Sequence, residues 1–145
     1  GLAGPECVAG LARALPVLGK LKQLTLHRNP ELFSGSSAED VEAFMEGLGK
    51  CSSLEDLRLQ STGLLNAAGA LAKALPGLSK LSSLDLSDNP AFIGDGGVEG
   101  SRVFLQSLEH CQNVEELWLQ NSGLCRASDI MARLLPSFPK MRKLI

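Results

Sequence analysis

The side chains that most often act as nucleophiles, bases or metal ligands are sparse in this sequence. Its four cysteines are Cys7, Cys51, Cys111 and Cys125, with no CxxC spacing, and only two histidines accompany them. That is too few for the usual zinc-ligand patterns. Cys51 and Cys111 occupy a position at which equivalent segments carry Leu or Phe, and Cys125 stands where another segment has Leu65. We therefore expect these three thiols to pack as small hydrophobic residues and not to react.

Two further features could suggest catalysis. A nucleophile–base pair needs an activated Ser or Cys within hydrogen-bond reach, and we expect none for His27 or His110, since Cys111, which follows His110, belongs to the expected core. The run GDGGVEG at residues 94–100 is as rich in glycine as a phosphate-binding loop, but it lacks the GxGxxG spacing and a following Lys-Ser/Thr pair. We expect a flexible loop there, between a strand and a helix. The sequence predicts no enzyme, no cofactor and no metal.

Composition narrows the class of partner. The 145 residues are 44% hydrophobic and 21% charged, which is enough apolar material for the core of one domain. The 14 basic and 16 acidic residues give a net charge of −2 without a basic stripe, which argues against binding to nucleic acid. No apolar run approaches the ~18 residues of a membrane span, and no secretory leader opens the chain. These features predict a cytoplasmic protein that binds neither nucleic acid nor membrane.

An internal repeat organises the chain. LKQLTLHRNP at Leu21 returns as LSSLDLSDNP at Leu81, and LEDLRLQSTGL at Leu54 returns as VEELWLQNSGL at Val114. Residues 21–80 and 81–140 are identical at 20 of 60 positions without a gap. The units are 1–20 (partial), 21–53, 54–80, 81–113, 114–140 and 141–145 (partial). Fixed periods of this size are typical of a solenoid, in which each unit buries its apolar face against its neighbours.

Within each unit the apolar spacing changes from two to that of a helix. LxxLxL predicts a short strand with one buried face. We expect the following leucines to be buried: Leu24, Leu26, Leu57, Leu59, Leu84, Leu86, Leu117 and Leu119. Helical spacing follows at Val41, Phe44, Met45 and Leu48, and Pro16, Pro76 and Pro136 are placed to end helices. We predict an α/β fold, a curved horseshoe-like solenoid with parallel strands on the concave face and helices on the convex face.

The segments LKQLTLHRN, LEDLRLQST, LSSLDLSDN and VEELWLQNS resemble the leucine-rich repeat family, specifically its ribonuclease-inhibitor-like subclass. The resemblance implies one leucine-rich repeat domain over residues 1–145, expected to be a piece of a longer array. The ninth motif position is held by Asn29, Thr62, Asn89 and Ser122. An Asn there can bind the backbone of the bend that ends the strand, and Thr or Ser can do part of the same.

ALAKALPGLSKLSSLDLSDN is similar to the repeat region of NOD-like receptors, cytosolic proteins of innate immunity. This resemblance implies a non-catalytic module for protein–protein interaction or ligand sensing. The alternative is a regulator of an enzyme, such as a ribonuclease-inhibitor-like blocker or a Ran GTPase-activating-like protein. Self-association through uncapped solenoid ends is a further expectation.

The residues between the leucines should form the partner-binding face. The candidates are Trp118, Arg58, Asp85, Gln60, Gln120 and His27. We expect Arg58 to pair with Asp85, Lys22 to lie beside Glu55, and Glu115 and Glu116 to lie beside Arg142 and Lys143. Trp118 is the only Trp in the chain and projects outward by this register, so it is the candidate anchor for a protein partner. The alternative is that Trp118 only covers the sheet and packs on Ile145.

Overall fold

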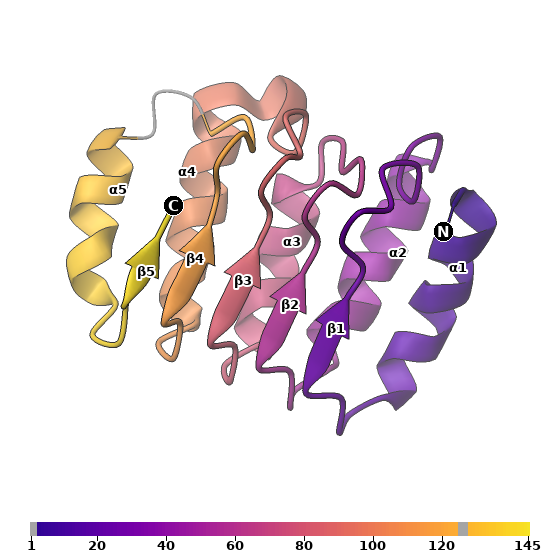
Figure 1. Cartoon of the computed structure of the whole chain (residues 1–145), viewed down its shortest axis with the longest axis horizontal. Helices are drawn as coiled ribbons and strands as arrows, with labels where there is room; N and C mark the ends of the chain where they lie inside the picture. The colour runs from indigo at the N-terminus through magenta and orange to yellow at the C-terminus, as the bar shows by residue number, and fades with distance from the viewer. Residues whose placement is uncertain (1–2, 125–127) are drawn as a thin grey trace.

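The computed structural model describes residues 3–124 and 128–145 and shows an α/β chain with one five-stranded, all-parallel sheet (Figure 1). The strands lie side by side in chain order: β1 (Gln23–Thr25), β2 (Asp56–Arg58), β3 (Ser83–Asp85), β4 (Glu116–Trp118) and β5 (Lys143–Leu144). The helices are α1 (Pro5–Ala14), α2 (Ala38–Gly49), α3 (Ala68–Ala74), α4 (Gly97–Ser107) and α5 (Ser128–Leu134). Short 3-10 helices adjoin four of them: η1 (Leu15–Val17), η2 (Leu75–Gly77), η3 (Gly94–Gly96), η4 (Leu108–His110) and η5 (Leu135–Ser137). Each of the units 21–53, 54–80, 81–113 and 114–140 holds one strand followed by one helix.

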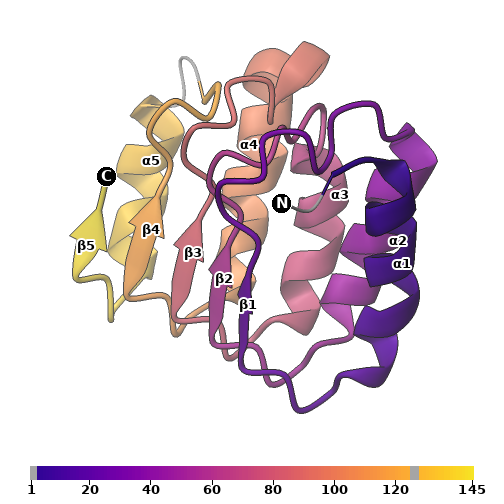
Figure 2. The same ribbon diagram turned by 45° about the vertical axis from the view of Figure 1, so that its right-hand side comes forward.

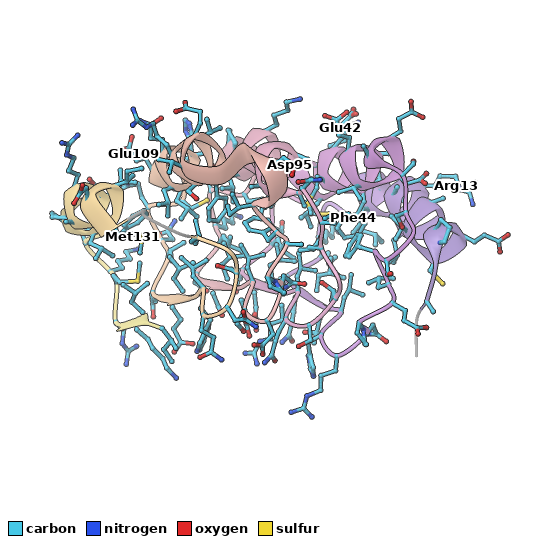
Figure 3. The ribbon with its side chains drawn as sticks, turned by 90° about the horizontal axis from the view of Figure 1, so that it is seen from above. Arg13, Glu42, Phe44, Asp95, Glu109 and Met131 are labelled. Atoms are coloured by element: carbon cyan, nitrogen blue, oxygen red, sulfur yellow. The ribbon has the colours of Figure 1, made fainter. Side chains whose placement is uncertain are left out.

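The molecule has two layers. Figures 1 and 2 show the helices on one face of the sheet, while no helix of the described part covers the other face. Seen from above, the helices follow an arc with the sheet on its inner side (Figure 3). Phe44 points between the layers and is fully buried, whereas Glu42 and Glu109 point away from the sheet. The expected α/β class, with parallel strands and helices on opposite sides, is confirmed.

The leucines of the LxxLxL motifs lie on the face of the sheet that packs against the helices. Seven of the eight expected leucines are buried, from Leu57 at 0% to Leu119 at 9% exposed. The prediction is wrong for Leu24, which is only half-buried. Among the described residues β1 pairs only with β2, so no neighbouring unit covers the other side of Leu24.

Each strand ends in a bend that side chains stabilise. The residues at this bend, Arg28, Ser61, Asp88 and Asn121, all have a positive φ between 50° and 59°. In the next position Asn89 donates from Nδ2 to the carbonyls of Leu59, Leu86 and Ser87, and its Oδ1 accepts the N–H groups of Thr62 and Leu64. The Thr62 hydroxyl donates to the Leu59 carbonyl. The expected role of this position is confirmed, and Asn89 additionally joins two neighbouring units.

The prolines end helices as expected, with one addition. In α1, α3 and α5 the α-helix stops before the Leu-Pro pair, and a single 3-10 turn follows in place of an immediate return to the strand. The prediction of a loop at residues 94–100 is wrong, because Gly94–Gly96 forms η3 and Gly97 already begins α4. The buried Ser101, Phe104 and Leu105 hold α4 on the core, and this packing outweighs the low helix propensity of glycine.

The thiols of Cys51 and Cys111 pack in the core. Cys51 and Cys111 are 0% exposed, and Cys7 is half-buried; these three cysteines are free. The Cys51 thiol lies 3.3 Å from the Leu15 carbonyl oxygen, and that of Cys111 lies 3.6 Å from the Leu75 carbonyl oxygen. Burial raises the pKa of the Cys111 thiol to about 12, which keeps it protonated and poorly nucleophilic. The expectation for Cys51 and Cys111 is confirmed, while Cys125 lies outside the described residues.

Candidate binding surface on the open face of the sheet

The open face is built from the residues that alternate with the buried leucines. Parallel register places equivalent positions side by side, so that three rows run across the strands. The first row is Gln23, Asp56, Ser83, Glu116 and Lys143, and the second is Thr25, Arg58, Asp85 and Trp118. Beyond the strand ends, His27, Gln60, Ser87 and Gln120 form a third row, by their positions in the repeat. We call these three rows the sheet face.

The structure brings some of the candidate site residues together and separates others. Arg58 pairs with Asp85 and Asp85 with Trp118 in the strand register, so these three are neighbours on β2, β3 and β4. Arg58 is exposed, whereas Asp85 and Trp118 are half-buried. His27 and Gln120 are both exposed, but they stand in the first and the fourth full unit and belong to no common cluster.

The expected ion pair between Arg58 and Asp85 is not formed. Arg58 Nε instead lies 3.1 Å from Asp56 Oδ1 on its own strand. Asp85 Oδ1 accepts both the hydroxyl and the N–H of Ser87, the latter at 3.0 Å, so this oxygen is engaged along the strand and not across it. The hydrogen bond and the charge of Asp56 raise the pKa of Arg58, with smaller contributions from Asp85 and Glu116.

Two other charge contacts follow the predicted register. Lys22 Nζ lies 3.3 Å from Glu55 Oε1, and Arg142 Nη1 lies 3.4 Å from Glu115 Oε2. Gln60 Nε2 donates to Asp88 Oδ2 at 3.1 Å. The ion pairs are exposed and contribute little to stability, so their main effect is to fix side-chain positions at the rim of the sheet face.

Trp118 is neither fully open nor buried. Its register neighbours are Asp85 on β3 and, by extension of the β4–β5 pairing, Ile145. The Nζ of Lys143 lies 5.0 Å from the centroid of the indole, within the range of a cation–π contact. The ring therefore keeps an accessible part while one neighbour already supplies a cation.

Lys143 lies in the first row beside Glu116, as the register predicts. One member of this surface escaped the sequence reasoning. Ser83 lies between Asp56 and Glu116 and is only 9% exposed although it faces outward. Its burial depends on the long side chains around it, for which the repeat carries no signal.

The described part of the chain has hollows on its helix side but no cluster of metal-binding side chains. Among the residues that the structure describes, no three His, Cys, Asp or Glu side chains are grouped so that they could hold a metal ion. Hollows occur on the helix side, between α2 and α3 near Gly49 and Lys73, and between α4 and α5 near Arg102 and Asp129. None of the described helices combines the length and the apolar character needed to cross a membrane.

Comparison with known proteins leaves the family open. No protein-family model matches the chain, and no curated protein matches it.

Proposed function

We propose that the chain is a leucine-rich repeat module of the ribonuclease-inhibitor-like subclass that binds a protein partner through its sheet face. The observation that carries the proposal is the contiguous group formed by Arg58, Asp85 and Trp118 on an uncovered face of the sheet. An aromatic ring beside charged and amide side chains is the composition of an interface hot spot and its rim. Rigid parallel strands hold these side chains in place before a partner arrives, which lowers the entropy that binding must overcome.

The repeat resemblance supports a cytosolic setting and, most specifically, the ligand-sensing region of a NOD-like innate immune receptor. Unpaired, buried Cys51 and Cys111 support a reducing compartment. The alternative, a regulator of an enzyme, would use the same face. Two results would favour this alternative: addition of the chain raises the turnover of a GTPase partner, or it lowers the activity of a ribonuclease partner.

The test begins with a partner found by cross-linking from the sheet face, with a photoreactive group at Gln120, which is exposed. The Kd of the purified pair is then measured for Trp118→Ala and for Glu42→Ala, an exposed change on the helix side. We expect affinity to fall at least tenfold for Trp118→Ala and to stay unchanged for Glu42→Ala. Equal affinities for both variants would contradict binding through the sheet face.

A further inference from the structure

A buried hydroxyl on the sheet face has no partner. Leu84 faces the core at 0% exposed, so the alternation of the strand turns its neighbour Ser83 to the open face. Ser83 is nevertheless only 9% exposed, and its Oγ forms no hydrogen bond. The other such hydroxyl among the described residues belongs to Ser36, which is half-buried before α2. A buried polar group without a partner is costly and needs an explanation.

Three acidic residues neighbour Ser83 on the sheet, and we call Asp56, Asp85 and Glu116 the acidic cluster. Asp56 and Glu116 are the register partners of Ser83 on strands about 4.8 Å away, and Asp85 follows two residues along β3. Asp56 already accepts hydrogen bonds from Gln23 and Arg58, and Asp85 accepts them from Ser87. Among the described residues the Glu116 carboxylate has neither a hydrogen bond nor an ion pair, whereas its backbone N–H donates to the Ser82 carbonyl, so the acidic cluster is open on the side of β4.

The spacing of the acidic cluster suits an organic cation better than a metal ion. The described residues include no acidic group tight enough to hold a metal. Arg58 and Lys143 show what fits: the first donates to Asp56, and the second lies over the ring of Trp118. Arg58 and Lys143 are register neighbours of Asp85 and Glu116, at two edges of the acidic cluster. The three carboxylates of the cluster carry one more charge than these two cations. Asp56 raises the pKa of Arg58 most, and Asp85 and Glu116 add smaller contributions in the same direction, so all three carboxylates act on this neighbouring cation.

We propose that the protein partner inserts an arginine side chain between Asp85 and Glu116, where the guanidinium donates to both carboxylates and to Ser83 Oγ and stacks beside Trp118. This inference rests on the proposed function and specifies the chemistry of the partner. An arginine fits better than a lysine because its planar guanidinium has five N–H donors in a fixed fork, which can meet a carboxylate and a hydroxyl together. The unpartnered Ser83 then acquires the donor that the free chain lacks.

The direct test uses a probe in place of the partner. The full, uniformly 15N-labelled chain is titrated with N-acetyl-arginine methylamide, with N-acetyl-citrulline methylamide as the neutral isostere. We expect the arginine probe to shift the amide signals of Ser83 and Glu116 and the indole N–H of Trp118, and the citrulline probe to leave them in place. Equal shifts from both probes would overturn the proposal, as would shifts of the same signals by calcium chloride at equal concentration, which would indicate a metal site.

Two variants and one matched control localise the effect. Glu116→Gln should weaken binding of the arginine probe about tenfold, because a hydrogen bond to a charged group is lost. Glu109→Gln removes the same charge from the helix side of the molecule and should have no effect. Ser83→Ala should weaken the probe about threefold, yet leave the free chain at least as stable, because it removes a hydroxyl without a partner. Equal probe affinities for Glu116→Gln and Glu109→Gln would refute the assignment.

The partner assay separates this proposal from the one on which it rests. If Trp118→Ala weakens the partner and Glu116→Gln does not, the chain binds through its sheet face without an arginine contact, and only the present inference fails. If neither variant affects the partner, the proposed function fails, whatever the probe does. If both variants weaken partner binding and the citrulline probe shifts no signals, both proposals stand.

Discussion

Replacing Asn89 with Ala tests how neighbouring units are held together. The Asn89 amide is 0% exposed, and its Oδ1 accepts the N–H groups of Thr62 and Leu64, each at 3.1 Å. In Asn89→Ala these two buried donors lose their acceptor, at about 1–3 kcal/mol each. The carbonyls that Nδ2 serves suffer less, because each retains a second lone pair and the Leu59 carbonyl keeps the Thr62 hydroxyl. We expect a loss of about 2–6 kcal/mol in the free energy of unfolding.

The control is Asn113→Ala, in the turn before β4. Asn113 is half-buried, its Nδ2 donates to the Ser79 carbonyl and its Oδ1 accepts from Lys140 Nζ, and both partner residues are exposed. Its removal should cost about 0.5–1.5 kcal/mol, the net contribution of an ordinary hydrogen bond. Urea unfolding followed by circular dichroism and by Trp118 fluorescence gives both free energies. A cost for Asn89→Ala no larger than that for Asn113→Ala would refute the reasoning, since Asn89 accepts from two buried amides of the preceding unit and Asn113 accepts from an exposed lysine.

Further predictions concern the core, the thiols and the ends. Leu86→Ala, at a fully buried position, should cost roughly 2–5 kcal/mol in urea unfolding, whereas Trp118→Ala should cost less, because its ring is half-buried; the reverse order would contradict the register. The Cys111 thiol, with its pKa raised to about 12, should react with Ellman's reagent at pH 8 only at the rate of unfolding. The raised pKa of Cys111 stabilises the folded chain fully below pH 9, the ordinary thiol value, and this stabilisation should be lost as the pH rises from 9 to about 12. If the free energy of unfolding, measured relative to Cys111→Ala, did not change over that pH range, the prediction would be wrong. Leu18, Leu144 and Ile145 are exposed near the two ends of the stack, and we expect sedimentation to show concentration-dependent self-association, which a monomer at all concentrations would contradict.

The repeat predicts what depends on local sequence, and fails where the outcome depends on neighbours. Each LxxLxL segment carries its own inward leucines, so strand order and register could be read before the structure. Leu24 is only half-buried because, among the described residues, β1 is the edge strand of the sheet, and no residue of the Leu24 motif encodes that position. Arg58 had two acidic neighbours in the repeat pattern, and in the structure it donates to Asp56 while Asp85 Oδ1 accepts from Ser87. Ser83 escaped for the same reason, since its burial is a property of the side chains around it.

The alternation of long and short units also has a physical basis in the loops. In the short units a Gly follows the ninth motif position, at Gly63 and Gly123, with φ of 74° and 75°. A Cβ on Gly63 would lie 2.3 Å from the carbonyl oxygen of Pro30 in the preceding long unit, and a Cβ on Gly123 would lie 2.5 Å from that of Pro90. The carbonyl of the Asn-Pro loop in each long unit therefore packs directly against the glycine turn of the next short unit. Two long units in succession would place a Pro where Gly63 or Gly123 now stands, against the Pro carbonyl of the unit before it and at a positive φ that Pro cannot adopt. This contact accounts for the short unit that follows each long one.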